Sequence, residues 1–132
     1  MKRKSINKDH IIIIAIHTGN HWLFAQIVNS KIIIHDSIRK SVDKYVDCSS
    51  ISGILENIRK FADMFYGGTH KFEVDESYPQ QKNMSDCGMF LLCGIKDIVR
   101  SYKEWSFDQD DIWRKRYQVA REFLKQKLEG FE

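Results

Sequence analysis

Cys87 is the residue of this sequence best suited to nucleophilic chemistry. It lies between Asp86 and Gly88, at the junction of a polar loop and a nearly apolar segment over residues 89–99 that is typical of a buried helix. A cysteine in the first turn of a helix faces unpaired backbone N–H groups and the positive end of the helix dipole, and both favour the reactive thiolate. The other two cysteines are most simply small core or surface residues: Cys48 and Cys93.

A catalytic thiol needs a base, and the base needs an orienting carboxylate. His21 lies at the start of an expected strand, and Asp36 ends the next strand, 15 residues later. Asn29-Ser30 supplies a tight turn between those strands, so the strands should pair as a hairpin. Pairing brings the start of one strand beside the end of the other. We therefore expect His21 and Asp36 to be neighbours.

The remaining histidines have no comparable setting, and each is expected to be a surface or a satisfied core residue: His10, His17, His35 and His70. The alternative to a catalytic pair is a metal site made of four residues: His17, His21, His35 and Asp36. We expect no metal there, because neither the helical spacing nor the CxxC spacing typical of metal ligands occurs.

Several short elements resemble the signature of the ubiquitin-like protein proteases, the SUMO (sentrin)-specific cysteine peptidases. They are the pair His21-Trp22 at a strand start, the pair Asp36-Ser37 after the hairpin, QQKNMSDCGMF over 80–90, FDQDDI over 107–112 and IWRKRYQVAREFLKQKL over 112–128. Each element alone is a weak signal, but their order and spacing together are specific. The resemblance implies a papain-like core with a permuted triad, in the order His, Asp, Cys.

The resemblance also implies a role for each matching residue. His21 would be the general base, Asp36 its orienting carboxylate and Cys87 the nucleophile. Gln81, six residues before the cysteine, would place its side-chain amide at the oxyanion hole, beside the Cys87 backbone N–H. A fixed donor at that position typically lowers the barrier to acyl transfer by about 3–4 kcal/mol.

Three neighbouring residues are expected to support the site rather than to react. Trp22 would pack over the site and bind substrate, and Asp86 would cap the helix that begins near Cys87. Gln80 misses the oxyanion spacing by one residue and is expected to be structural. Lys82 departs from the family pattern, which often has a proline there, and this departure is expected to loosen the loop.

The resemblance covers the chain from about residue 10 to its end, and it implies that about two-thirds of such a catalytic domain is present. The other part would precede Ile11 and would supply a helical subdomain, substrate contacts and a tryptophan that covers a Gly-Gly tunnel. No tryptophan precedes Trp22. We expect residues 1–9 to be a disordered tail and residues 10–132 to be a single catalytic domain without that subdomain.

The elements that must position these residues follow from the hydrophobic pattern. Short β-branched or alternating segments predict strands near 11–16, 22–28 and 31–35, with 71–74 as a candidate fourth strand. Helical periodicity predicts helices near 50–66, 88–99 and 109–129. Because strands come first and helices later, we expect an α+β fold with a small mixed or antiparallel sheet.

Three finer expectations concern the faces of these elements. Strand 22–28 should turn Leu23, Ala25 and Ile27 to one face of the sheet, with Phe24, Gln26 and Val28 on the other. The run Ile11 to Ile16 is almost wholly apolar, which suits a strand buried on both faces. The last helix, capped by Asp108, carries an apolar stripe: Trp113, Tyr117, Ala120, Leu124, Leu128 and Phe131.

Composition excludes several classes of protein. The chain has 132 residues, the size of one domain, and its formal charge of +3 is too mild to indicate nucleic-acid binding. The longest apolar run, from Ile11 to Ile16, is far short of the roughly 20 residues that span a bilayer. Three cysteines without an export signal predict a reduced, intracellular protein of the nucleus or cytoplasm.

The function implied by the resemblance is removal or processing of a ubiquitin-like modifier, such as SUMO. The protein would cut after Gly-Gly through a thioester acyl-enzyme, with no cofactor and with the modifier or a modified protein as its partner. Two alternatives are an acetyltransferase of the same clan and a weak or inactive modifier-binding remnant. The QQ-to-DCG element and the last helix favour the protease, and the intact triad argues against long decay.

Overall fold

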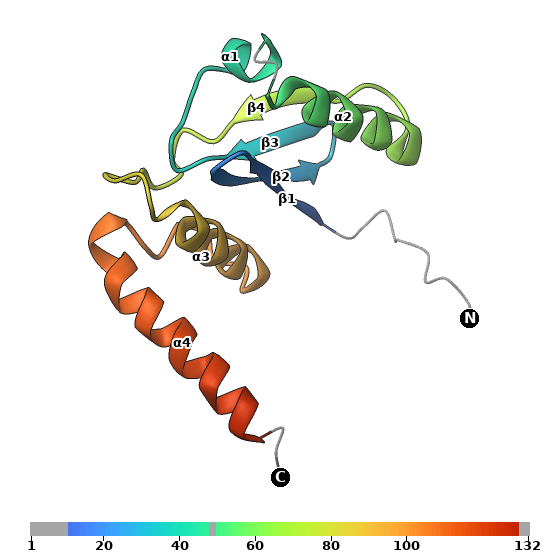
Figure 1. The fold of residues 1–132 in the computed structure, drawn as a ribbon. Helices are drawn as coiled ribbons and strands as arrows, with labels where there is room; N and C mark the ends of the chain where they lie inside the picture. Colours follow the sequence, from blue (N-terminus) through green and yellow to red (C-terminus); the bar gives the residue numbers. More distant parts are fainter. Residues whose placement is uncertain (1–10, 48–49, 130–132) are drawn as a thin grey trace.

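The computed structural model describes residues 11–47 and 50–129, with side chains as far as residue 126. The chain folds around one four-stranded sheet (Figure 1). Its strands are β1 (Ile12–Thr18), β2 (His21–Val28), β3 (Lys31–His35) and β4 (Lys71–Val74). β1, β2 and β3 are antiparallel neighbours, whereas β4 lies parallel to β3. The expected strands and the mixed sheet are confirmed.

The helices are α1 (Val42–Asp47), α2 (Ser52–Tyr66), α3 (Cys87–Val99) and α4 (Ile112–Glu129). A 3-10 turn, η1 (Gln109–Asp111), leads into α4, and the Asp108 carboxylate caps η1 by accepting from the Asp110 backbone N–H at 2.9 Å. The three expected helices and the α+β class are confirmed. α1 was not expected, because it has only six residues, half of them charged, and buries only Tyr45.

Two tight turns determine where the strands begin and end. Gly19 (φ 60°) lies in the turn between β1 and β2, and Asn29 (φ 55°) lies in the turn between β2 and β3. Glycine and asparagine are the residues that adopt this left-handed backbone most readily. Thr18 pairs with His21 across the first turn, so His21 is the first residue of β2.

The sheet lies between two helical layers, with α2 on one face and α3 on the other (Figure 1). The alternation expected along β2 is found. Leu23, Ala25 and Ile27 belong to the core beneath α2, and Phe24 belongs to the core beneath α3. This two-layer packing holds the start of α3 against the sheet.

α3 approaches the sheet closely because residue 94 is glycine. A Cβ atom on Gly94 would lie 2.3 Å from the Tyr78 hydroxyl oxygen and 2.8 Å from Phe24 Cε1. The Tyr78 hydroxyl also donates a hydrogen bond to the Phe90 carbonyl. The loop before α3, the helix and strand β2 therefore meet at one point without space for another carbon atom.

The expectation that the first strand is buried on both faces is wrong. Only Ile16 is buried in this strand, Ile12 to Ile14 are partly covered, and Ile11 is exposed just before it. β1 is one of the two edge strands of the sheet. The helical layers bury the inner strands β2 and β3 more completely than this edge.

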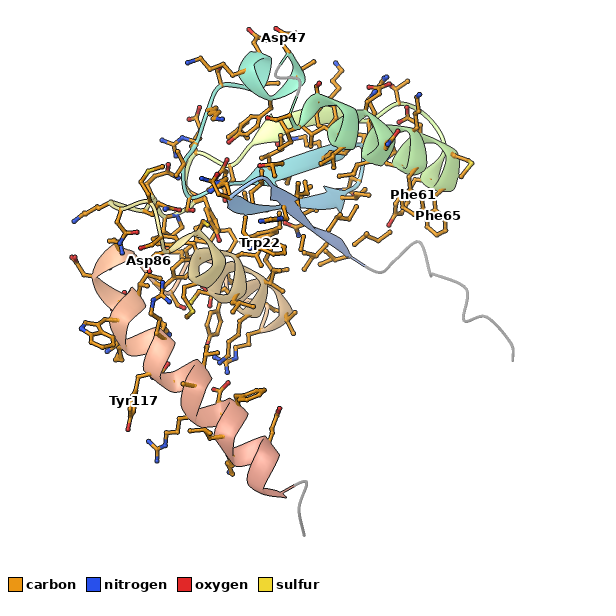
Figure 2. The ribbon with its side chains drawn as sticks, in the orientation of Figure 1. Trp22, Asp47, Phe61, Phe65, Asp86 and Tyr117 are labelled. Carbon is orange, nitrogen blue, oxygen red and sulfur yellow. The ribbon has the colours of Figure 1, made fainter. Side chains whose placement is uncertain are left out.

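The apolar stripe expected along the last helix is largely exposed where its side chains are described. Trp113, Tyr117 and Leu124 are exposed by 79%, 66% and 60%. α4 instead turns Ile112 and Val119 toward α3, and Figure 2 shows Tyr117 on the outer side of the helix. A helical period marks an apolar face but does not say whether another element covers it. The side chain of Leu128 is outside the described part of the structure. Phe131, Cys48 and residues 1–9 are also outside it.

Candidate active site

His21 and Asp36 lie in direct contact, as the predicted hairpin requires. His21 Nε2 is 2.7 Å from Asp36 Oδ1, and the Asp36 carboxyl is buried. With Nε2 donating to the carboxylate, the proton sits on that nitrogen and Nδ1 keeps a free lone pair. This arrangement gives the imidazole one nitrogen that can accept a proton.

The Asp36 carboxylate is held by two further donors. The Tyr45 hydroxyl donates to Oδ2 at 2.6 Å, and the Ile38 backbone N–H donates to Oδ1 at 2.9 Å. Burial and the bond to Asp36 raise the pKa of Tyr45, so this hydroxyl keeps its proton and donates it. α1 therefore has a role in the site, because it delivers Tyr45. Sequence reasoning missed Tyr45; its only signal is one aromatic residue in the short, half-charged segment VDKYVD.

Cys87 is the first residue of α3 and lies against the β1–β2 turn. Its Sγ is 3.9 Å from the Asn20 carbonyl oxygen, and the residue is buried. A Cβ on Gly88 would meet Trp22 Cδ1 at 3.9 Å, so the Trp22 indole lies beside the first turn of the helix. The turn that carries His21 is thus packed on the helix that begins with the thiol. Cys87 and Cys93 are both free thiols.

Asp86 does not cap α3 with its side chain, which corrects the expectation made for it. The carboxylate instead accepts from Asn83 Nδ2 at 2.6 Å, Gln109 Nε2 at 2.9 Å and Arg116 Nε at 3.0 Å. Hydrogen bonding to Arg116 is the main reason that the pKa of Asp86 lies below its usual value. The residue before the thiol is therefore an ionised, buried carboxylate tied to η1 and α4.

Gln81 and Gln80 fasten the loop before α3 to the chain that follows β3. The Ser37 hydroxyl donates to Gln81 Oε1, and Gln81 Nε2 donates to the Asn83 carbonyl. Gln80 Nε2 donates to the Asp36 carbonyl at 2.8 Å, and its Oε1 accepts from the Arg39 N–H at 2.9 Å. The second N–H of the Gln81 side-chain amide is therefore available to donate to another acceptor, whereas the Gln80 side-chain amide is hydrogen-bonded to backbone groups.

A second histidine–carboxylate pair lies on the α3 side of the sheet. His35 Nδ1 is 2.9 Å from Asp75 Oδ2, and His35 Nε2 is 2.9 Å from Gln26 Oε1. The Trp105 indole N–H donates to the same Asp75 oxygen at 3.0 Å. Burial lowers the pKa of His35 and outweighs the opposing effect of Asp75. Both ring nitrogens are engaged, so His35 is a satisfied core histidine.

The metal alternative finds no support in the described part of the chain. Its residues contain no group of three or more His, Cys, Asp or Glu side chains that could hold a metal ion. His35 and Asp36 are adjacent in sequence, yet they bind different partners, Asp75 and His21.

None of the helices described here combines the length and apolarity needed to cross a bilayer.

Comparison with known proteins identifies the family to which this chain is similar. Residues 1–128 match the model of the Ulp1 protease family, C-terminal catalytic domain. The chain is 32% identical over 119 residues to the ubiquitin-like-specific protease ESD4 of Arabidopsis thaliana, and 28% identical over 137 residues to sentrin-specific protease 5 of Homo sapiens. These alignments cover 87% and 96% of this chain, but only 24% and 17% of the two relatives.

A solved structure gives the same result for the fold. The C-terminal Ulp1 protease domain in complex with Smt3, the yeast orthologue of SUMO, aligns with a TM-score of 0.60 at 22% identity. The alignment covers 80% of this chain and 48% of that one. The fold is therefore that of this protease domain, and the chain spans about half of its length.

Proposed function

Because this chain belongs to the Ulp1 protease family, we propose that it is a cysteine peptidase that cleaves after the Gly-Gly terminus of a SUMO-type modifier. The observation that carries the proposal is the 2.7 Å contact of His21 with Asp36, made on the turn that packs against the start of α3. This pairing orients one imidazole nitrogen as a base beside the helix of the thiol.

The proposed reaction has two halves, acylation of Cys87 and hydrolysis of the resulting thioester. His21 Nδ1 takes the Cys87 proton, and the thiolate attacks the carbonyl carbon of the last glycine. The resulting oxyanion accepts hydrogen bonds from the Cys87 backbone N–H and from the free amide N–H of Gln81. The intermediate collapses to a thioester as His21 protonates the leaving amine. Water, deprotonated by His21, then hydrolyses the thioester and restores the thiol.

Two features support a SUMO-type substrate. Relatives of this chain are named ubiquitin-like-specific and sentrin-specific proteases, and a solved relative is bound to Smt3. Trp22 leaves a partly exposed indole beside Gly88, where a Gly-Gly terminus without side chains could lie flat. We assign substrate contact to Trp22 on this basis.

The test is covalent capture by modifiers that carry a C-terminal electrophile. A SUMO-type probe should form a stable adduct at Cys87, while a ubiquitin probe should form little. Cys87→Ala should abolish the adduct, and Cys93→Ala, a change at the other described thiol, should retain it. An adduct at Cys93, or no adduct from a folded chain whose Cys87 is reduced, would reject the proposal.

A further inference from the structure

A buried negative charge lies one residue before the proposed nucleophile. Asp86 is 7% exposed, and Cys87 follows it directly. A nearby carboxylate opposes formation of a second negative charge, because like charges in a partly desolvated site repel. Left alone, Asp86 would therefore work against a Cys87 thiolate. Figure 2 shows Asp86 between the start of α3 and α4.

The same carboxylate organises the loop that carries Gln81. Asn83 Nδ2 donates to Asp86 Oδ2 from within the loop, at 2.6 Å. Gln109 Nε2 donates to the same oxygen at 2.9 Å, and Gln109 Oε1 accepts from the Lys82 backbone N–H at 2.6 Å. Gln109 thus joins the residue after Gln81 to the residue before Cys87. An acceptor at position 86 is needed for both bonds.

Arg116 supplies the positive charge at this carboxylate. Its Nε donates to Asp86 Oδ1 at 3.0 Å, its Nη2 donates to the same oxygen, and Nη2 lies 3.5 Å from the Ser85 carbonyl. Ion pairs of this two-donor type combine charge with fixed orientation. Arg116 comes from the inner side of α4, 30 residues after Asp86.

We propose that Arg116 is a positioning residue for Cys87: it cancels the charge of Asp86, so that Asp86 can hold the loop without opposing the thiolate. This inference rests on the proposed function of Cys87 as nucleophile. Two other charged groups lie near this ion pair. Asp110 lines the same hollow as Asp86 and Arg116. Lys82 Nζ lies 3.8 Å from the Asp110 carboxylate. On the opposite side, His21 faces its own carboxylate, Asp36.

The proposal predicts shifts of opposite sign for the two partners. Arg116→Gln leaves Asp86 uncompensated, so the pH midpoint of Cys87 alkylation should rise by about 0.5–1 pH unit. Asp86→Asn leaves the Arg116 cation uncompensated, so the midpoint should fall by a similar amount. The double change should return the midpoint close to that of the parent chain, and Arg116→Lys should restore it largely. A purely structural role gives no such reversal of sign.

The experiment measures the rate of Cys87 alkylation by iodoacetamide across pH, with mass mapping of the labelled residue. Arg114→Gln is the matched control, because Arg114 is on the same helix and pairs with Asp111 at 2.9 Å, away from the thiol. Its midpoint should equal that of the parent. The proposal is overturned if Arg116→Gln and Asp86→Asn shift the midpoint in the same direction, or if neither shifts it.

One further variant separates this inference from the proposed function. His21→Ala should raise the alkylation midpoint strongly if His21 is the base for Cys87. If His21→Ala has no effect while the Asp86 and Arg116 variants shift in opposite directions, charge compensation holds and the catalytic assignment fails. If His21→Ala shifts the midpoint and the other two do not, the catalytic assignment stands and charge compensation fails. Should Arg116→Gln fail to fold, Asp86→Asn must still lower the midpoint, and Arg116→Lys must leave it close to that of the parent chain.

Discussion

Two of the three histidine–carboxylate pairs among the described residues, His21–Asp36 and His35–Asp75, differ in their surroundings. His21 is partly exposed and packed beside the start of α3, whereas the His35 ring is buried and stacks on Phe24, with a centroid distance of 4.7 Å. The first pair keeps one free imidazole nitrogen, and the second keeps none. Surroundings rather than pairing alone therefore decide which histidine can act as a base.

His21→Ala should abolish capture of the modifier probe and lower the free energy of unfolding by about 1–3 kcal/mol, because it removes a hydrogen-bond donor from the buried Asp36 carboxylate. His35→Ala should leave capture intact. It removes a buried ring and leaves Asp75 with fewer partners, so it should cost about 2–4 kcal/mol. Urea unfolding and probe capture measure both effects. Loss of capture by a folded His35→Ala variant, with His21→Ala active, would show that the wrong histidine is assigned.

Tyr45 provides a second prediction, because its hydroxyl donates to Asp36 at 2.6 Å inside the core. Tyr45→Phe keeps the ring but removes a hydrogen bond to a buried carboxylate, a bond worth about 1.5–3 kcal/mol. We expect the rate of probe capture to fall about tenfold while the chain stays folded. Tyr117→Phe, a change at an exposed tyrosine of α4, serves as the control. Equal rates for Tyr45→Phe and the parent would show that Asp36 is oriented without the hydroxyl.

Substitutions of the two adjacent glutamines, Gln80 and Gln81, should have different effects. Gln81→Ala removes the proposed oxyanion donor and should lower kcat by about 10²–10³ on a modifier–reporter substrate. Gln80→Ala should lower kcat much less, and its cost should appear in stability, because Gln80 binds the backbone at Asp36 and Arg39. Steady-state kinetics and thermal unfolding of the two variants distinguish the roles. Similar losses of kcat at both positions would reject the spacing argument.

At this scale the sequence predicts what a hairpin brings together and little else. The contact of His21 with Asp36 follows from strand pairing across one tight turn. The contact of Asp86 with Arg116 joins residues that are 30 positions apart on different elements, and no periodic pattern links them. Such contacts depend on how α4 docks on α3, which local propensity does not determine.

At the scale of elements, the periodicity of hydrophobic residues predicts which segments form strands and which form the longer helices. The strands and three of the helices appear close to their expected residues. α1 was missed because it is six residues long and is stabilised by one buried side chain, Tyr45, rather than by an amphipathic face. Short helices of this kind form through tertiary contact and leave a weak local signal.

Gly94 tests the packing of α3 on the sheet. Gly94→Ala introduces a carbon atom 2.3 Å from the Tyr78 hydroxyl oxygen and 2.8 Å from Phe24, so we expect a loss of about 1–3 kcal/mol or more. Gly53→Ala is the matched control, because a Cβ there meets nothing within 4 Å inside α2. It should stabilise by up to about 1 kcal/mol. Urea titration of both variants checks the contrast; a neutral Gly94→Ala would show that α3 lies farther from β2.

At the scale of the whole molecule, apolar surface is distributed unevenly. The α2 and α3 layers bury the middle of the sheet, while β1 forms an edge and α4 runs out beside α3 (Figure 1). The outer row of α4 carries Trp113, Tyr117 and Leu124, all well exposed. Its inner row carries Ile112, Val119 and the Arg116 side chain that reaches Asp86. The helix therefore contributes to the site through one face only.

The two rows of α4 should respond differently to substitution. Replacing Trp113 and Tyr117 together by Gln removes two aromatic rings that are 79% and 66% exposed, so the free energy of unfolding should change by no more than about 0.5 kcal/mol. Ile112→Ala removes a buried side chain that packs with Phe107 and Val119, and should cost about 2–4 kcal/mol. Because exposed apolar rows promote association, the double variant should also sediment as a smaller species than the parent at high concentration. Unfolding at low concentration and sedimentation velocity measure these effects. A large loss in the double variant, with Ile112→Ala neutral, would mean that α4 docks on α3 through its aromatic row, and Arg116 would then be turned away from Asp86.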